Sequence, residues 1–325
     1  MRALVCSSLE GIDSLEVGDL DGRRPGRGEV RVEVEAAGVN FPDLLVIRGL
    51  YQDQPPLPFA PGMEIAGTVA EVGEGVGNVT VGDRVFSFVP HGAYAEEVVV
   101  PSDSLFPVPE GMTSDVAASL PIAYGTSYHA LVDRAALQEG ETLLVLGAAG
   151  GVGMAAVQIG KALGARVIAA VSSEEKEQAV RASGADEVIR YDRSDLREEL
   201  KRLAPAGVDV VYDPVGGDAT EAAFRSTAWR GRHLVIGFAA GDIPALPVNL
   251  ALLKGSSLVG VFWGRFAATE PVANRANMAS LTEWWKEGRI DPVVSETYPL
   301  ERAPDALRRI GSRGAIGKLI VHPRQ

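Results

Sequence analysis

The hydrophobic positions of this chain follow two periods in succession. Between Val30 and Val108, short runs such as EVRVEVEAAGV, IAGTVAEVG and AYAEEVVVP alternate apolar and polar residues and are separated by glycine, proline and Gly-Asp turns. A period of two is typical of strands with one buried face, so this segment is predicted to form an antiparallel sheet or a small barrel. No helix longer than three turns is expected there.

The period changes from about Ser114. The stretch SDVAASLPIAYGTSYHALVDRAAL predicts helical pieces that are broken at Pro121 and Gly125. Six strand-like runs follow, alternating with helical stretches: ETLLVLGA, ARVIAAV, ADEVIRY, VDVVYDPV, RHLVIGF and SSLVGVFW. Short apolar strands with helical connections indicate a doubly wound parallel sheet of the Rossmann type, covered on both faces.

After Trp263 the chain has two further helical stretches and a final strand, GKLIVHP. This tail is too short to form its own core, so it is expected to pack back on the first segment. The predicted fold is therefore α/β, with a nucleotide domain inserted into a β-rich domain to which both chain ends contribute. The predicted boundaries are 1–124, 125–263 and 264–325.

Length and charge narrow the class of protein. A chain of 325 residues exceeds the usual single-core limit of about 250 to 300 residues, so two domains are expected. The net charge of −12 repels phosphate backbones, so nucleic acid is not an expected partner.

No apolar run is long enough to span a bilayer and the N-terminal stretch carries acids, which together predict a cytoplasmic protein without membrane contact. The one cysteine, Cys6, excludes an intrachain disulfide and is expected to be a buried apolar residue.

A glycine turn lies between the first strand and the first helix of the predicted nucleotide domain. Gly150, Gly151 and Gly153 lie between the strand TLLVLGA and the helix VGMAAVQIGKAL. Glycine lets the backbone approach a pyrophosphate, and the following helix N-terminus presents free amides to it. The first glycine of the usual fingerprint is replaced by Ala148. The alternative is a tight turn that serves packing only.

The second strand ends in two serines where an NAD site usually supplies an acid for the adenosine ribose. Ser172 and Ser173 follow RVIAAV, Lys176 lies one turn further, and Arg190 and Tyr191 end the third strand. Neutral hydroxyls beside a cation suit a 2′-phosphate and favour NADPH over NADH. Alternatively, Ser172 or Ser173 caps the next helix, since SSEEKEQAV matches Ser-x-x-Glu. The adjacent acids Glu174 and Glu175 weigh against a phosphate.

Several segments in order resemble a known family. AAGVNFPDLLVIRGLY, PFAPGMEIAGTVAEVGEGVGNVTVGDRV, GAAGGVG and SSEEK together resemble the medium-chain dehydrogenase/reductase superfamily. More narrowly, they resemble its zinc-independent quinone oxidoreductase branch, which includes zeta-crystallin-like quinone reductases and enoyl-thioester reductases. The resemblance covers nearly the whole chain and implies a GroES-like catalytic domain, a Rossmann domain that binds NADPH, and a homodimer.

The chain departs from the zinc-dependent relatives at the metal ligands. Asn40 stands where those enzymes have a cysteine, and Met63 stands where they have a histidine before the glutamate. A structural zinc would need four cysteines, and the chain has one. The four histidines show no paired-ligand spacing: His91, His129, His233 and His322. No metal is therefore expected, and a conjugated acceptor suits such a site better than a simple ketone.

The resemblance also implies roles for single residues. Asn40 matches a position near the nicotinamide ribose or the substrate, and Tyr51 in IRGLYQ matches the tyrosine that protonates or orients substrate in enoyl-thioester reductases. A neutral phenol can donate a hydrogen bond to a developing enolate. The other implied cofactor positions are Thr126, Gly150, Gly151, Val152, Ser172, Lys176, Tyr191, Gly237, Phe238, Phe262 and Lys318. For Phe238, Phe262 and Lys318, plain core or surface roles are equally open.

Three functions remain open at this point. The first is an NADPH-dependent reductase of quinones or other conjugated carbonyls, and the second is an enoyl-CoA or acryloyl-CoA reductase with Arg48, Arg265 and Arg275 as candidates for a basic rim. The third is a non-enzymatic NADPH-binding protein with a structural or RNA-associated role, which the net charge disfavours. A homodimer is expected from the family and from the apolar strand SSLVGVFW, which would otherwise expose a sheet edge.

Overall fold

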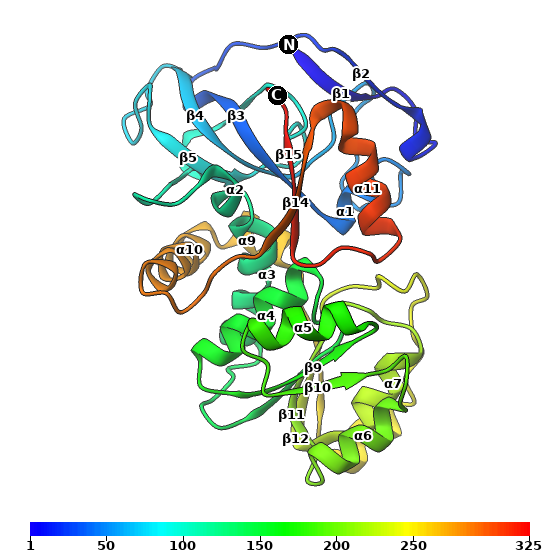
Figure 1. Ribbon diagram of the computed structural model, residues 1–325. Coiled ribbons are helices and arrows are strands. Elements are labelled where there is room, and N and C mark those ends of the chain that lie inside the picture. Colours follow the sequence, from blue (N-terminus) through cyan, green and yellow to red (C-terminus); the bar gives the residue numbers. More distant parts are fainter. The chain divides into compact units, whose positions relative to one another are not determined.

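The computed structural model describes residues 1–325, and the chain divides into two compact units (Figure 1). The first unit comprises Met1–Ile122 and Pro292–Gln325, and the second comprises Ala123–Asp291. Both chain ends therefore belong to the first unit, with the second unit inserted between them. The chain returns to the first unit at Pro292, rather than at residue 264 as the sequence suggested.

Two helices explain the later return. The helices α9 (Trp263–Thr269) and α10 (Pro271–Lys286) pack on α3 (Gly125–Tyr128) and on the π-helical η4 (His129–Arg134). The ring centroids of His129 and Phe266 are 3.9 Å apart, and Asn277 Nδ2 donates to Asp133 Oδ2 at 2.7 Å. These contacts lie within the second unit, so the helical stretch after Trp263 belongs to it.

The second unit contains the predicted doubly wound sheet. Its strands are β8 (Thr142–Val145), β9 (Arg166–Val171), β10 (Glu187–Arg190), β11 (Val208–Asp213), β12 (Thr227–Val235) and β13 (Ser257–Gly260). All pairings are parallel, and the order is β10-β9-β8-β11-β12-β13. This is the strand order of a Rossmann fold, and it confirms the predicted fold class.

Helices cover both faces of this sheet, as Figure 1 shows, with α4 and α5 on one side and α6 and α7 on the other. The bounds are α4 (Gly151–Ala162), α5 (Glu174–Ala182), α6 (Leu196–Leu203), α7 (Asp218–Arg225) and α8 (Asn249–Lys254). Leu144, Ile168, Ile189 and Val211 of the strands pack with Leu200 of α6 in one buried cluster. Strands that are apolar on both faces therefore fix the sheet between two layers of helix.

The first unit is built on a seven-stranded sheet in which β3 is central. Its order is β14-β15-β3-β4-β5-β7, and β6 also pairs with β3. The strands are β3 (Glu29–Val39), β4 (Glu64–Val72), β5 (Arg84–Phe88), β6 (Glu97–Pro101), β7 (Phe106–Pro107), β14 (Val294–Pro299) and β15 (Lys318–His322). The C-terminal β15 pairs antiparallel with β3, with Ile320 opposite Gly38, so the last part of the predicted tail, from Pro292, packs back on the first unit.

Smaller elements complete the first unit. The strands β1 (Arg2–Cys6) and β2 (Leu15–Asp19) form a separate antiparallel pair. The helical elements are η1 (Ile12–Ser14), α1 (Phe41–Val46), η2 (Ser102–Ser104), α2 (Ser114–Ala117), η5 (Leu300–Arg302) and α11 (Ala303–Gly311). No helix between Val30 and Val108 exceeds three turns, as expected.

The predicted helix breaks at Pro121 and Gly125 take a different form. Pro121 lies in a π-helical segment, η3 (Leu120–Tyr124), and the helical backbone continues through Gly125 into α3 and η4. A Cβ at Gly125 would lie 2.6 Å from Met278 Cε and 2.9 Å from Trp263 Cε2. Glycine is therefore needed there for close packing against α9 and α10, and it does not end the helix.

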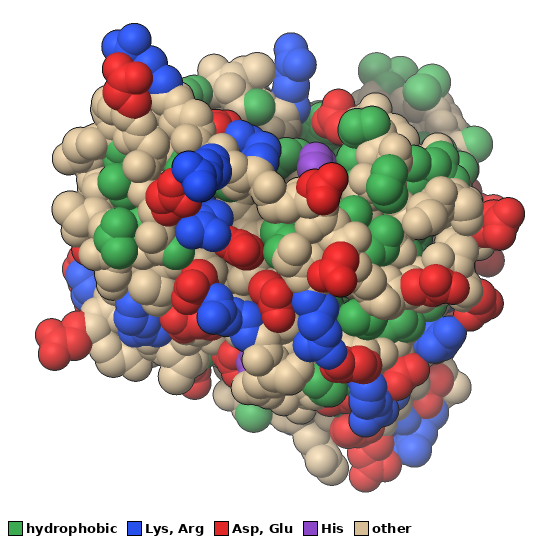
Figure 2. Space-filling model, turned by 90° about the horizontal axis from the view of Figure 1, so that it is seen from above, with side chains coloured by type: hydrophobic (Ala, Val, Ile, Leu, Met, Phe, Trp, Pro, Cys, Tyr) green, Lys and Arg blue, Asp and Glu red, His purple; other side chains and the backbone are tan.

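The surface carries both signs of charge. On the face shown in Figure 2, Lys and Arg side chains are interspersed with Asp and Glu side chains. Measured against the thickness of a bilayer, every helix is too short or too polar to cross it.

Candidate functional site

The glycine turn of the second unit lies between β8 and α4. Gly147 has a φ of 56°, and Gly150 is the N-cap of α4 with a φ of −75°. No side chain caps this helix, so its first amide groups are available to a ligand. A Cβ at Gly153 would lie 2.8 Å from Ala148 Cα, so that glycine lets the helix approach the strand closely. An uncapped helix N-terminus at the carboxyl end of a parallel strand is a binding place for an anion such as pyrophosphate.

The loop after β9 separates the roles of the two serines. Ser173 is the N-cap of α5, and its Oγ accepts from Lys176 N at 3.3 Å. Ser172 is not the cap, and its Oγ accepts from Lys176 Nζ at 3.2 Å. Tyr191 N donates to Val171 O at 3.2 Å, and the Tyr191 side chain is 45% exposed. The structure thus gathers Ser172, Lys176 and Tyr191 at the end of β9, where the sequence places the adenosine ribose.

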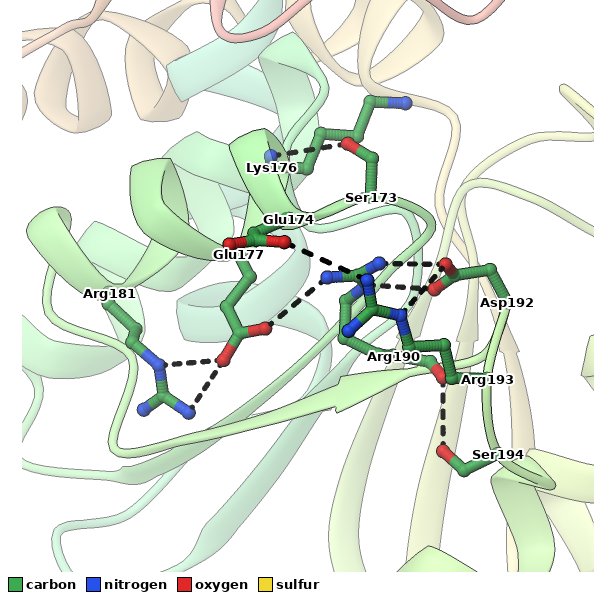
Figure 3. Close-up of polar contacts among 9 residues, drawn as sticks. All are labelled: Ser173, Glu174, Lys176, Glu177, Arg181, Arg190, Asp192, Arg193 and Ser194. Carbon is green, nitrogen blue, oxygen red and sulfur yellow. Dashed lines mark hydrogen bonds and ion pairs between the residues drawn. The ribbon is translucent and has the colours of Figure 1, made fainter.

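Figure 3 shows that acids share this region with the cations. Arg190 donates to both carboxylate oxygens of Asp192, from Nε at 2.8 Å and from Nη2 at 2.7 Å. Its Nη1 lies 3.6 Å from Glu177 Oε2. Arg193 Nη2 lies 3.7 Å from Glu174 Oε2, and Arg193 Nε lies 3.9 Å from Asp192 Oδ2. The pair with Arg190 lowers the pKa of Asp192, and it raises the pKa of the Arg190 guanidinium.

The remaining expected cofactor residues of the second unit lie in three places. Thr126 is buried in α3, next to Ser127, whose Oγ donates to Val152 O at 2.9 Å and contacts Tyr212 Oη at 2.8 Å. Ser127 therefore ties α3 to the start of α4. The others lie after β12 and β13: Gly237 and Phe238 are half-buried, and Phe262 is 49% exposed at the start of α9.

Asn40 and Lys318 meet in the first unit, in a buried cluster with Glu64. Lys318 Nζ donates to Glu64 Oε1 at 2.6 Å, to Asn40 Oδ1 at 2.8 Å and to Val39 O at 3.1 Å. Asn40 Nδ2 donates to Glu64 Oε1 at 2.8 Å, and Glu64 Oε2 accepts from Ile122 N at 2.8 Å. Glu64 is fully buried and Lys318 is 3% exposed. All three ammonium protons of Lys318 are therefore used within the unit.

This cluster bears on the metal that some relatives carry. The amide of Asn40 is hydrogen-bonded to Glu64 and Lys318, and Met63, the residue before Glu64, is buried. A second cation would have to approach the Lys318 ammonium, which the same carboxylate already holds. Nowhere in the chain do three His, Cys, Asp or Glu side chains gather as metal ligands. The residues present do not fit a catalytic zinc.

A second buried acid lies beside this cluster. Asp43 is the third residue of α1, and its Oδ2 accepts from Asn40 N at 2.8 Å and from Tyr94 Oη at 2.6 Å. Its Oδ1 has no partner, and the side chain is fully buried. Burial raises the pKa of Asp43 to about 7, although the Tyr94 and Asn40 hydrogen bonds oppose that rise. Burial also raises the pKa of Tyr94 well above its usual value, so the phenol remains a donor.

Asp43 predicts a dependence of stability on pH. Its pKa is raised in the folded chain, from 3.8 to about 7, so folding favours the protonated acid and stability is lost as pH rises towards 7. In Asp43→Asn, a neutral side chain of the same shape removes this loss. Between pH 5 and pH 8 we expect the unfolding free energy of the wild type to fall by about 2 kcal/mol more than that of the variant. Urea unfolding of both proteins at pH 5 and pH 8 measures this difference. Equal losses of unfolding free energy in the wild type and in Asp43→Asn would contradict the prediction.

Tyr51 lies in the first unit, after α1. Its side chain is half-buried, and its hydroxyl makes no hydrogen bond in the structure. Burial raises the pKa of the phenol, and the carboxylates of Asp53 and Asp43 raise it further. Tyr51 is therefore protonated at neutral pH and has a hydrogen bond to donate.

The sequence did not single out several residues that shape these sites. Glu64 was noted only as the residue after Met63, and its partner Lys318 is 254 positions away. No local pattern predicts such a pairing. The other missed residues are Asp43, Tyr94, Ser127 and Asp192. A charged residue within an otherwise apolar stretch, as at Glu64, is the one signal that a buried ion pair leaves in a sequence.

Family models match both units. A model described as "Alcohol dehydrogenase GroES-like domain" matches residues 26–110. A model described as "Zinc-binding dehydrogenase" matches residues 151–278, which begin at Gly151, the first residue of α4, and contain the loop after β9.

Individual proteins match nearly the whole chain. Quinone oxidoreductase-like protein 2 of Mus musculus is 39% identical over 322 residues, which cover 98% of this chain and 91% of that protein. The crystal structure of Escherichia coli quinone oxidoreductase complexed with NADPH has a TM-score of 0.92 and 29% identity, covering 99% of this chain and all of that one. The crystal structure of CurK enoyl reductase has a TM-score of 0.89 and 27% identity, covering 99% of this chain and 98% of that one.

Proposed function

This chain belongs to the medium-chain dehydrogenase/reductase superfamily, in its quinone oxidoreductase branch, and from that membership we propose that it transfers a hydride from NADPH to a quinone or another conjugated carbonyl. Membership makes it an oxidoreductase that uses a nicotinamide dinucleotide. The proposal adds the choice of NADPH, the class of acceptor and independence from zinc.

The loop from Ser172 to Lys176 carries the choice of cofactor. It offers a serine hydroxyl and an ammonium at the end of β9, where an NAD site usually has a carboxylate. A 2′-phosphate would accept from the Lys176 ammonium and the Ser172 hydroxyl, while Ser173 is occupied in capping α5. Tyr191 completes this pocket, which we call the ribose-phosphate pocket (Ser172, Lys176 and Tyr191).

The other expected residues divide between direct contact and support. Gly150, Gly151 and Val152 present the start of α4 to the pyrophosphate, and Thr126, Gly237, Phe238 and Phe262 are proposed to contact the nicotinamide half. In the first unit, Asn40 and Lys318 spend their hydrogen bonds on Glu64 and on each other. We therefore assign these two residues to positioning.

The cluster of Asn40, Glu64 and Lys318 supports the proposed independence from zinc. The Lys318 ammonium neutralises Glu64, so no metal is needed to compensate the buried carboxylate. The family model is described as zinc-binding, but its matched segment does not contain this cluster. Without a Lewis acid, the enzyme suits acceptors in which added charge is delocalised by conjugation.

These residues position the reactants and donate a hydrogen bond. The reduced nicotinamide, when bound, supplies the hydride. Tyr51 donates its hydroxyl hydrogen bond to the oxygen on which negative charge develops, and its raised pKa keeps that hydrogen in place at neutral pH. The acceptor gains the hydride of the nicotinamide and one proton from solvent water, so a quinone becomes a hydroquinone.

Lys176 gives a prediction for cofactor choice. In Lys176→Ala, we expect the dissociation constant of NADPH to rise roughly 10- to 100-fold, because a charge-assisted hydrogen bond to the 2′-phosphate is lost. NADH has no such phosphate, so its dissociation constant should stay within about twofold. Titration by calorimetry measures both, with Lys201→Ala, an exposed residue of α6, as the control. Equal losses for the two cofactors would show that Lys176 does not contact the phosphate.

An acceptor panel tests the function. NADPH oxidation is followed at 340 nm with 1,4-benzoquinone, 9,10-phenanthrenequinone and crotonyl-CoA in parallel, and we expect the quinones to react fastest. Fastest turnover with crotonyl-CoA would instead support an enoyl-CoA reductase. Tight NADPH binding without turnover of any acceptor would contradict both, and would favour a non-enzymatic NADPH-binding protein.

The enoyl reductase is retained as the second candidate because of the likeness to CurK enoyl reductase. Binding of CoA phosphates would require basic residues near the acceptor. Arg265 and Arg275 are exposed on α9 and α10 of the second unit, whereas Arg48 is exposed in the first unit. Within the second unit, Arg265 and Arg275 lie on different helices and make no shared site, so the quinone is preferred.

A homodimer is proposed from the edge of the second unit's sheet. β13 ends the sheet, and Leu258 on it is 54% exposed. Three apolar residues that precede β13 in the sequence are more than two-thirds exposed: Val248, Leu252 and Leu253. An apolar open edge favours pairing with a second copy. Light scattering at micromolar concentration should give twice 34.2 kDa for the wild type and 34.2 kDa for Leu258→Lys. A monomeric wild type would overturn the proposal.

A further inference from the structure

The ion pairs beside the ribose-phosphate pocket have a consequence for cofactor choice. Arg190 is paired in register with Val171, the residue before Ser172, so its backbone adjoins the pocket. The Arg190 side chain is 11% exposed, and its guanidinium lies between the carboxylates of Asp192 and Glu177 (Figure 3). An arginine in this place would be a strong ligand for a phosphate if its donors were free.

Asp192 occupies two of the guanidinium donors of Arg190, Nε and Nη2. It accepts from Arg190 Nε and Nη2 through both of its oxygens, which is the same planar fork that a phosphate would use. Asp192 is also fixed from the backbone, because the turn after β10 is closed by Ser194 Oγ and N and by Arg193 N, which all donate to Arg190 O. The competing carboxylate is therefore built into the loop that carries the arginine.

We propose that Asp192 is a specificity-determining residue that weakens the preference of this enzyme for NADPH over NADH. Asp192 withholds the Arg190 guanidinium from the adenosine 2′ position and places a carboxylate near the bound phosphate. A 2′-hydroxyl carries no charge and can donate to a carboxylate, so NADH is not disfavoured in the same way. This inference rests on the proposed use of NADPH, and it makes Lys176, in contact with Ser172, the cation that contacts the phosphate.

The test is the ratio of the NADPH and NADH dissociation constants in Asp192→Asn. An asparagine amide of the same size offers one neutral acceptor in place of the two-oxygen fork, so the guanidinium is released. We expect NADPH to bind about tenfold more tightly than to the wild type, with NADH changed by less than about twofold. Thermal unfolding of each variant shows that the chain remains folded.

The same substitution in an Arg190→Met background is the matched control. It removes the same negative charge but has no guanidinium to release, so the tightening of NADPH should shrink to about twofold. An unchanged ratio in Asp192→Asn, weaker NADPH binding, or an equal gain in the Arg190→Met background would each overturn the role of Asp192.

The wild type and Lys176→Ala distinguish a failure of the proposed NADPH use from a failure of the role of Asp192. Suppose that the wild type binds NADPH no more tightly than NADH, and that Lys176→Ala leaves both dissociation constants unchanged. The assignment of NADPH as the cofactor is then wrong. If the wild type prefers NADPH through Lys176 but Asp192→Asn leaves that preference unchanged, only the role of Asp192 is overturned.

Discussion

Replacing Lys318 by methionine is expected to lower the free energy of unfolding by about 3–5 kcal/mol. The substitution keeps an unbranched side chain, one atom shorter, but removes the charge that faces Glu64 Oε1 at 2.6 Å. Glu64 is fully buried, so its carboxylate would be left with only the Asn40 amide and Ile122 N as donors. An uncompensated buried charge is among the most destabilising changes in a protein core.

Two comparisons isolate this cause. Arg324→Met breaks the exposed pair with Glu33, which lies 2.9 Å away, and should cost less than about 1 kcal/mol. In Glu64→Gln/Lys318→Met both charges are gone, so most of the loss should be recovered. Urea unfolding at pH 8 measures all three variants. A loss for Lys318→Met that is no larger than that for Arg324→Met would show that the pair does not stabilise the first unit.

Two glycines at the start of α4, the N-cap Gly150 and Gly153 in the first turn, are expected to differ in their effects on stability. At Gly150, a Cβ would lie 3.5 Å from Gly147 O, an ordinary contact, and its φ and ψ of −75° and 171° suit any residue. At Gly153, a Cβ would lie 2.8 Å from Ala148 Cα and 2.9 Å from Ala148 C, and backbone atoms cannot give way. Gly150→Ala should therefore fold normally, whereas Gly153→Ala should lose about 1–3 kcal/mol of stability.

Cofactor binding should fall in both variants. The methyl group in Gly150→Ala lies at the N-cap of α4, where the pyrophosphate approaches, so the NADPH dissociation constant should rise at least about tenfold without loss of stability. Gly153→Ala should weaken binding as well, because it separates the helix from the strand. Thermal unfolding and NADPH titration on the same samples measure both quantities. Unchanged NADPH affinity in Gly150→Ala would contradict the placement of the pyrophosphate at this turn.

The nucleotide-binding sheet was predictable because its signal is local. Each of its six strands is a short apolar run, and burial on both faces forces that composition on the strand itself. The glycines of the turn are similarly local, since close backbone approach admits no other residue at Gly153. The helix after Leu120 was misjudged because Gly125 serves packing against Trp263 and Met278, which lie far along the chain.

The candidate sites were predictable only in part. Ser172, Lys176 and Tyr191 were expected from their places at the ends of the second and third strands of the sheet. Lys176 contacts Ser172, and Tyr191 N contacts the neighbouring Val171 O, while their role in cofactor binding stays a prediction. The commitment of Lys318 to Glu64 was not predictable, because the pairing depends on β15 returning beside β3. Asp192 was missed for a different reason. Whether an arginine is held by a neighbouring carboxylate depends on side-chain geometry that a sequence does not specify.

The most direct measurement is a calorimetric titration of the full chain with NADPH and with NADH. We expect one NADPH per chain, bound at least about tenfold more tightly than NADH, because Ser172 and Lys176 stand where an NAD site has an acid. Equal affinity for the two cofactors, or no binding of either, would contradict an NADPH-dependent enzyme.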